Sequence, residues 1–288
     1  MKLYPIQCGN FKLDGGAMFG VVPKSLWERT NPADSKNLIE LGTRSLLVED
    51  GKKLILIDCG LGNKQDEKFF GHYSLYGDES LDKNLKKFGF VREDITDVFL
   101  THLHFDHCGG AIEWNDDKSG YRPAFKNAQF WTNENHWQWA TEPNPREKAS
   151  FLKENILPMQ ESGQLQFLPT PKTGNYGFAP DLKMDVIFVD GHTEKQMLPV
   201  IQYQEKTIVF AADLIPTAGH IPQVYVMGYD TRPLLTMEEK GKFLKQCVEN
   251  EYLLFFEHDA HHELASLKMT EKGVKLDETF SFNEVFGY

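Results

Sequence analysis

Five short apolar segments, each followed at once by polar residues that can bind a metal, constrain the fold of this chain more than any other feature. The segments are Leu54–Ile57, Val98–Leu100, Val186–Val189, Ile208–Ala212 and Tyr252–Phe256. Their β-branched and aromatic residues favour strands buried on both faces, as in layered α/β proteins. The polar residues that follow are Asp58, Thr101-His102, Asp190-Gly191-His192, Asp213 and Glu257-His258-Asp259. Because an open sheet has room for a site at its strand ends, we expect these side chains to gather at one edge.

Helices are expected at three places between these segments. Ser80 is a suitable N-cap for an amphipathic helix that begins at Leu81. A second apolar repeat begins at Ala149, and Pro158 should end that helix. The Thr-x-x-Glu sequence at Thr236 has the form of a capping box and predicts the start of a third helix.

Long polar stretches that contain glycine, Gly15–Asn37 and Gly60–Glu79, are expected to form loops. The proline-rich stretch Pro169–Pro180 is too short to indicate a domain boundary, and there is no internal repeat. We therefore expect residues 1–288 to form a single domain of the α/β class.

Charge and composition exclude several kinds of partner. The chain has 31 basic and 42 acidic residues, a net charge of −11, so it lacks a basic footprint for nucleic acid or for an anionic membrane. No segment approaches the roughly 18–20 apolar residues that span a bilayer. Met1–Asn10 has no apolar signal-peptide core, and the four cysteines form no disulfide framework. We expect a cytoplasmic protein.

The segment Thr101–His107 contains four candidate metal ligands within six residues: His102, His104, Asp106 and His107. In an extended chain His102 and His104 point to the same side, because side chains alternate with a period of two. Gly109-Gly110 supplies flexibility where the chain must turn. Imidazole and carboxylate ligands suit zinc and related metals.

Further candidate ligands follow at strand ends. His192 lies 85 residues after His107, Asp213 follows 21 residues later, and His258 comes 45 residues after that. One zinc needs about four ligands, so five histidines and two aspartates favour a site with two metals. A bridging carboxylate at Asp213 would allow a metal–metal separation of about 3.5–4 Å.

These motifs resemble those of the metallo-β-lactamase-fold hydrolases, a large superfamily of αββα sandwich enzymes. The matching features are His-x-His-x-Asp-His at 102–107, then His192, Asp213 and His258 in the expected order. Asp58-Cys59-Gly60 is similar to the Asp-x-Gly element upstream. The matched positions run from about 58 to 259, so the resemblance implies an αββα sandwich for most of the chain.

The resemblance also implies roles for these residues. One metal would be bound by His102, His104 and His192, the other by Asp106, His107 and His258, and Asp213 would bridge them. Two divalent ions per chain are expected, zinc first, although manganese, cobalt and iron also accept these ligands. A bridging hydroxide would attack the carbonyl of a small-molecule ester or lactone. Asp106 or Asp213 would move the proton, and Asp58 would orient a histidine through its other ring nitrogen.

Within the superfamily, an aspartate at the bridging position disfavours the true β-lactamases, and His-x-His disfavours the flavodiiron branch. The amino-acid sequence of residues 102–107 and the spacing of the later ligands are similar to those of the quorum-quenching N-acyl-homoserine lactonases. Residues 13–20 and 212–217 resemble the branch that joins these lactonases to methyl-parathion-type hydrolases. The resemblance thus implies lactone opening, with organophosphate triester or aryl ester hydrolysis as the alternative.

The chain departs from the lactonases at one position. They carry a tyrosine three residues after the bridging aspartate, where this chain has Pro216. Tyr225, Tyr229 or His220 are the candidates to replace it. The candidate substrate-binding residues are Met18, Phe19, Phe105, His220, Met227 and Tyr229. Relatives of this kind are often homodimers. The hypothesis of another class, a non-catalytic metal-binding module, predicts metal binding without turnover.

Overall fold

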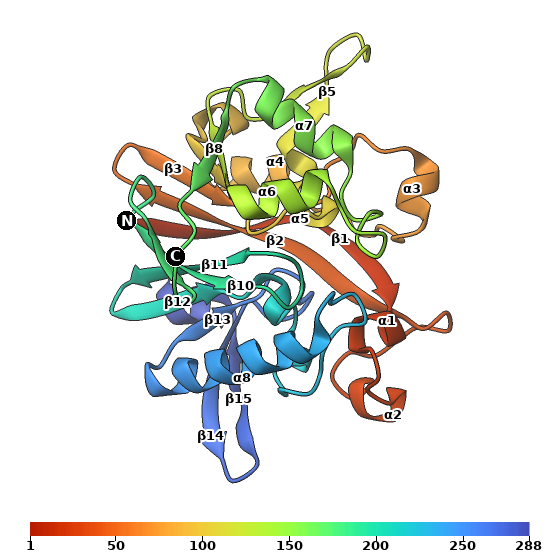
Figure 1. Ribbon diagram of the computed structural model, residues 1–288, viewed down its shortest axis with the longest axis vertical. Helices are drawn as coiled ribbons and strands as arrows, with labels where there is room; N and C mark the ends of the chain where they lie inside the picture. The colour runs from red at the N-terminus through yellow and green to blue at the C-terminus, as the bar shows by residue number, and fades with distance from the viewer. Residues whose placement is uncertain (288) are drawn as a thin grey trace.

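Two β-sheets lie face to face in the computed structural model, which describes residues 1–287 (Figure 1). The strands of the first sheet, in spatial order, are β1 (Lys2–Asp14), β2 (Leu38–Asp50), β3 (Lys53–Ile57), β4 (Asp97–Phe99), β7 (Gln129–Asn133) and β8 (Leu165–Leu168). Those of the second, also in spatial order, are β15 (Gly273–Phe280), β14 (Leu264–Thr270), β13 (Leu253–Phe255), β12 (Lys206–Phe210), β11 (Gln196–Tyr203), β10 (Met184–Val189) and β9 (Tyr176–Ala179). The chain passes from one sheet to the other in the segment 169–175, so each half of the chain builds one sheet.

Strand direction brings the predicted polar residues to one edge of each sheet. β3, β4, β7 and β8 are parallel to one another, so the residues after β3 and β4 emerge together. In the second sheet β12 and β13 are parallel, and β10 is related to β12 by two antiparallel pairings through β11. Strands β10, β12 and β13 therefore also end at a common edge.

Helices cover the outer faces of both sheets. The helices of residues 1–287 are α1 (Gly15–Phe19), α2 (Lys24–Trp27), α3 (Glu67–Gly71), α4 (Leu81–Lys87), α5 (Phe105–Cys108), α6 (Glu134–Thr141), α7 (Lys153–Glu161), α8 (Pro233–Glu249) and α9 (Phe282–Phe286). Helices α4, α6 and α7 lie over the first sheet, and α8 lies over the second (Figure 1). A small hairpin of β5 (Ile112–Trp114) and β6 (Tyr121–Pro123) projects beside α7. This is the αββα sandwich that the family resemblance implies.

The central strands are buried on both faces, as their apolar composition predicts. On β3, Ile55 and Ile57 face the core between the sheets, where Phe99 also lies. Leu54 and Leu56 face the opposite way, into the core beneath the helices of the first sheet. Alternate side chains of one strand thus contribute to two different hydrophobic cores.

One helix start is confirmed and two helix boundaries are corrected. Ser80 caps α4 by accepting a hydrogen bond from the backbone N–H of Lys83. Helix α7 begins only at Lys153, and Pro158 lies inside it instead of ending it. The helix continues because the Pro158 carbonyl still accepts from Ser162 N–H at 3.0 Å, and only the missing proline donor is lost.

The predicted capping box at Thr236 is wrong. Helix α8 starts three residues earlier, with Pro233 in its first turn, where the fixed φ of proline is suitable. The hydroxyl of Thr236 instead faces the carbonyl of Arg232. Glu239 accepts hydrogen bonds from the backbone N–H groups of Asp190 and Gly191, both at 2.9 Å. Its carboxylate therefore holds the loop that leads to His192.

The two long polar stretches contain short helices, α1 and α2 in the first and α3 in the second, which the sequence did not indicate. All four cysteines are free thiols. Among residues 1–287, no helix combines the length and apolar character that a membrane crossing requires.

Candidate metal centre

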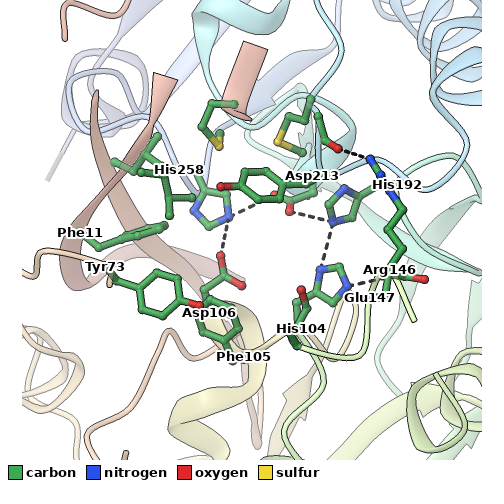
Figure 2. A pocket seen from close by; sticks show the side chains of 18 residues that line it. Phe11, Tyr73, His104, Phe105, Asp106, Arg146, Glu147, His192, Asp213 and His258 are labelled. Atoms are coloured by element: carbon green, nitrogen blue, oxygen red, sulfur yellow. Dashed lines mark hydrogen bonds and ion pairs between the residues drawn. The ribbon is translucent and has the colours of Figure 1, made fainter. Parts of the chain in front are cut away.

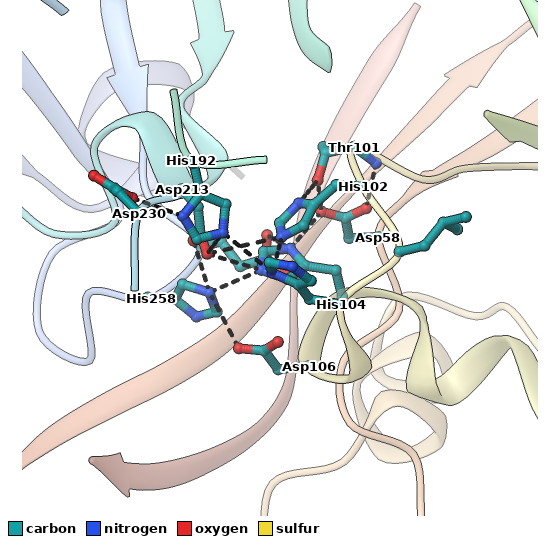
Figure 3. A network of polar contacts seen from close by, with 12 residues as sticks. Asp58, Thr101, His102, His104, Asp106, His192, Asp213, Asp230 and His258 are labelled. Carbon is teal, nitrogen blue, oxygen red and sulfur yellow. Dashed lines mark hydrogen bonds and ion pairs between the residues drawn. The ribbon is translucent and has the colours of Figure 1, made fainter. Parts of the chain in front are cut away.

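The seven predicted ligands come from five segments and meet between the ends of the two sheets (Figure 3). His102 and His104 lie on the turn after β4, and α5 carries Asp106 and His107. The other three follow strands of the second sheet: His192 after β10, Asp213 in the short 3₁₀ turn after β12, and His258 after β13. Each sheet therefore supplies part of the site.

The Gly109-Gly110 pair allows close backbone packing and does not act as a flexible turn. A Cβ at Gly109 would lie 2.1 Å from the carbonyl oxygen of Leu61, and one at Gly110 would lie 2.1 Å from that of Cys59. The backbone N–H of Cys59 donates to the His107 carbonyl at 2.8 Å. The loop after β3 is thereby held against the segment that carries the ligands.

The first donor group consists of His102, His104, His192 and Asp213, all buried. Nδ1 of His104 lies 3.0 Å from Nε2 of His102 and 3.1 Å from Nε2 of His192. Oδ2 of Asp213 lies 3.0 Å from Nε2 of His192. These atoms converge on a single point.

The second donor group consists of Asp106, His107 and His258. Nε2 of His107 and Nε2 of His258 are 3.1 Å apart, and Oδ2 of Asp106 lies 3.7 Å from Nε2 of His258. Oδ1 of Asp213 faces this group, at 3.1 Å from Nε2 of His258. The two oxygens of Asp213 therefore face the two groups, as a bridging carboxylate would.

Asp58 contacts residues at both ends of the segment Thr101–His107. It is fully buried, and its carboxylate accepts from the backbone N–H of Thr101 at 2.8 Å and from the Thr101 hydroxyl at 2.6 Å. Its Oδ2 also lies 3.0 Å from Nδ1 of His107. Glu257 approaches the same Nδ1 at 2.9 Å, but burial raises the pKa of Glu257 to about 8. Asp58 and Glu257 both face this ring nitrogen of His107.

In three other histidines, the ring nitrogen that points away from the donor groups also has a partner. Nε2 of His104 lies 3.3 Å from Oε1 of Glu147, and Nδ1 of His192 lies 2.8 Å from Oδ1 of Asp230. Nδ1 of His258 lies 2.8 Å from the carbonyl oxygen of Gly42. Acceptors at these positions bind the N–H tautomer that leaves the inward nitrogen free as a ligand.

Electrostatics at the centre are dominated by burial and by Asp213. Burial and the neighbouring imidazoles of His107 and His104 hold the pKa of His102 well below its usual range. Burial would also lower the pKa of His192, but the Asp213 carboxylate raises it to about 10. Conversely, burial would raise the pKa of Asp213, and the histidines around it, His192 first, hold that pKa well below normal.

A pair of divalent cations fits this donor set. In each donor group, the histidine nitrogens that face the centre lie 3.0–3.1 Å from one another and direct their lone pairs at the same space. The other ring nitrogen of each of these histidines already has an acceptor. Oδ1 of Asp213 is buried without a hydrogen-bond donor. Buried lone pairs and carboxylates without donors are unfavourable unless a cation compensates them.

A cavity of about 340 Å³ opens directly onto these donors (Figure 2). His104, Asp106, His192, Asp213 and His258 form its floor. Its walls are largely apolar or aromatic and include Phe11, Leu13, Met18, Leu41, Tyr73, Phe105, Met227 and Tyr229. Arg146 and Glu147 complete the opposite wall.

Of the six candidate substrate-binding residues, four line this cavity: Met18, Phe105, Met227 and Tyr229. Phe19 and His220 lie behind the wall, with their rings stacked at 4.1 Å. His220 is fully engaged there, since Nε2 faces the Met18 carbonyl at 2.9 Å and Nδ1 faces the Thr217 hydroxyl at 2.8 Å. Tyr225 packs edge-on against Phe19 and does not line the cavity.

Several residues around the centre had no signal in the sequence. Tyr73 and Phe11 reach the cavity from a loop and from an edge strand. Glu147 and Asp230 lie in irregular segments 43 and 38 residues from the histidines that they contact. His136 accepts from the backbone N–H of Leu103 at 2.8 Å and so supports the turn between two ligands. No local pattern marks such long-range contacts.

Residues 38–246 match the family described as the Metallo-beta-lactamase superfamily. An N-acyl homoserine lactonase of Bacillus cereus is 22% identical to this chain over 275 residues, which are 91% of this chain and 94% of that protein. The same identity is found with the lactonase of Bacillus thuringiensis.

Solved structures share the fold. A probable metal-dependent hydrolase from Staphylococcus aureus is 27% identical and superposes with a TM-score of 0.85, over 97% of this chain and 96% of that one. AidC, a dizinc quorum-quenching lactonase in complex with a product, is 22% identical and has a TM-score of 0.77, over 97% of this chain and 95% of its own.

Proposed function

The chain belongs to the metallo-β-lactamase superfamily, and we propose that this metal-dependent hydrolase opens lactone rings with two divalent ions. N-acyl-homoserine lactones are the lead substrates, and zinc is the first metal to test. The observation that carries the proposal is the apolar cavity of about 340 Å³ whose floor is the donor set itself. A cavity of this kind suits a small neutral ester with an apolar tail.

Each donor group combines residues that follow strands of both sheets. His102, His104 and His192 would hold one ion, Asp106, His107 and His258 the other, and Asp213 would contact both. When bound, such ions supply a Lewis acid for the carbonyl oxygen and an activated water. The protein fixes the geometry through the acceptors that hold each outward ring nitrogen.

Asp106 is the carboxylate best placed to move a proton. It lines the cavity, and its Oδ2 is 3.7 Å from the nearest histidine nitrogen, Nε2 of His258. Both oxygens of Asp213 face histidines at 3.0–3.1 Å, which leaves that carboxylate less free. Asp106 would therefore take a proton from the attacking water and deliver it to the leaving alkoxide.

Tyr229 is our candidate to replace the tyrosine that lactonases carry where this chain has Pro216. Tyr229 lines the cavity, whereas the other two candidates lie behind its wall. Burial, with Tyr73 and Asp106 nearby, raises the pKa of Tyr229 to about 12. Its hydroxyl therefore stays a hydrogen-bond donor at neutral pH and can donate to an ester oxygen.

The experiment is a substrate comparison with metal-reconstituted protein. We expect kcat/KM to be highest for N-acyl-homoserine lactones, compared with aryl esters and organophosphate triesters. Tyr229→Phe should lower kcat/KM for the lactone while metal content stays unchanged. Turnover of triesters or aryl esters alone would replace the lactone proposal with the alternative. Tight metal binding without turnover of any of the three would favour a non-catalytic module.

The four free thiols are compatible with a reducing compartment, and we propose the cytoplasm as the place of action. Fractionation of cells that express the protein from its own gene tests this. Recovery of the protein outside the cytoplasmic fraction would contradict it.

A further inference from the structure

The segment 144–150 touches the metal centre at several points, although none of its residues belongs to the seven predicted ligands. It connects α6 to α7 and forms part of the cavity wall. Glu147 reaches inward from it to His104, and Arg146 reaches across to the segment 228–230. Ser150 accepts from the backbone N–H of Phe105 at 3.0 Å. The segment 144–150 thus forms part of the cavity wall and also contacts the residues that carry the candidate ligands.

Burial and three polar contacts fix the position of the Glu147 carboxylate. Its side chain is almost fully buried, and Oε1 faces Nε2 of His104 at 3.3 Å. Oε2 accepts from the indole N–H of Trp139 at 2.6 Å and from the side-chain amide of Asn144 at 2.7 Å. Two donors therefore fix one oxygen of the carboxylate, and the other oxygen is left to accept from the imidazole.

Arg146, the residue before Glu147 in the chain, contacts the backbone of the segment that carries a second carboxylate, Asp230. Its guanidinium donates to the carbonyl oxygens of Gly228 and Asp230. The side chain of Asp230 is buried and faces Nδ1 of His192 at 2.8 Å. Nδ1 of His104 and Nε2 of His192 then point at the same space, 3.1 Å apart.

We propose that Glu147 is a positioning residue for His104 and that Arg146 links it to the Asp230–His192 pair, so that residues 144–150 set the metal affinity of the first donor group. In the second group, His107 is contacted by Asp58 and Glu257 and His258 by the backbone carbonyl of Gly42, and none of these residues belongs to the segment 144–150. The two metal positions should therefore respond differently to changes in this segment. This inference rests on the proposed dinuclear centre.

Glutamine at position 147 separates positioning from simple packing. The amide has the same shape, but Trp139 and Asn144 both donate, so they bind the amide oxygen and turn the amide N–H₂ toward His104. His104 Nε2 must then accept, which moves the ring proton to Nδ1, the nitrogen that should bind the metal. If the amide were flipped, its N–H₂ group would face the N–H groups of Trp139 and Asn144, and donor would meet donor.

The experiment titrates metal-free full-length protein with Co²⁺ or Zn²⁺ and follows both binding steps, with the visible spectrum of Co²⁺ as a readout independent of activity. We expect Glu147→Gln to weaken one step by about 10- to 100-fold and to leave the other near wild type. Glu147→Asp, which keeps the charge, should restore part of the affinity. Glu142→Gln, an exposed change in the same connection, is the control and should bind as wild type.

Arg146→Ala is the second variant, because Arg146 is exposed and its loss leaves Glu147 in place. It should weaken the same step by a smaller factor, and it decides the question if Glu147→Gln does not fold. Equal affinities in wild type and in the folded variants, or an equal loss at both steps, would overturn the inference. A wild-type protein that binds one ion would instead refute the dinuclear proposal, and the effect of Glu147→Gln on that ion would still judge the positioning role.

Discussion

Asp213 faces His258 through an oxygen that has no hydrogen-bond donor, at 3.1 Å from Nε2, while its other oxygen faces the opposite donor group. A single side chain in the 3₁₀ turn after β12 thus touches both halves of the centre. In the dinuclear centre that we propose, both metal positions depend on Asp213.

We expect Asp213→Asn to lose metal at both positions, because the amide keeps the shape but removes the negative charge that the surrounding histidines stabilise. The loss of hydrolytic rate should exceed the roughly 10- to 100-fold typical of outer partners of metal ligands. Elemental analysis of the purified variant, beside wild type, measures the metal content. Normal metal content at both positions would contradict a bridging role.

Asp58→Asn should destabilise the protein as well as the centre. Asp58 is fully buried and contacts both Thr101 and His107, so the substitution replaces a buried acceptor of both residues with an amide that also carries donors. Loss of one partner of a buried pair costs about 3 kcal/mol. Urea denaturation gives the free energy of unfolding, with the exposed change Asp181→Asn as control. Equal stabilities of the two variants would show that Asp58 contributes no more than a surface carboxylate.

Removal of metal should lower the melting temperature. Without cations, the inward nitrogens 3.0–3.1 Å apart and the buried carboxylate of Asp213 lose their compensation. A ligand at about 1,000 times its Kd adds about 4 kcal/mol, which corresponds to a shift on the order of 10 °C. Thermal melts with chelator, and after zinc is restored, measure the shift. An unchanged melting temperature together with full activity after dialysis against chelator would refute the metal centre.

The buried Lys240 predicts a specific pH dependence of stability. Its ammonium donates to the carbonyls of His220 at 2.9 Å and Tyr225 at 2.6 Å, and burial lowers its pKa to about 7. Between pH 7 and about 10.5 the unfolded chain binds a proton that the folded chain does not. The contribution of Lys240 to stability is therefore smallest below pH 7 and rises with pH, with a slope approaching about 1.4 kcal/mol per pH unit.

Comparison of wild type with Lys240→Met isolates this effect. We expect the difference in free energy of unfolding to move in favour of wild type from pH 7 to pH 9.5. Lys245→Met on the exposed face of α8 is the matched control and should show no such trend. A difference that stays constant with pH would mean that Lys240 keeps its proton in the folded state.

The strands and the clustering of the candidate ligands could be predicted because each apolar run and the polar residues after it are neighbours in the chain. Ile55 and Leu56 alternate within one apolar run, and Asp58 follows directly, so composition alone places the strand and its polar end. Ser80 was likewise recognisable as an N-cap from local sequence. The pairing of two sheets was implied by the family resemblance.

The errors arose where a residue's partner is distant in the sequence. Thr236 and Glu239 match the sequence pattern of a capping box, but Glu239 binds the backbone at Asp190 and Gly191, about 48 residues away. The sequence makes His220 a candidate for substrate binding, yet its ring stacks on Phe19 behind the cavity wall. Glu147 gave no signal for the same reason, since its role depends on His104.

The passage of the chain between the sheets at 169–175 has a practical consequence. A protein cut there would consist of two fragments, one with β1–β8 and His102, His104, Asp106 and His107, the other with β9–β15 and His192, Asp213 and His258. Neither fragment carries a complete coordination sphere. A divalent ion would then join separate polypeptides in addition to the hydrophobic core between the sheets, and chelation should weaken the association of the two fragments.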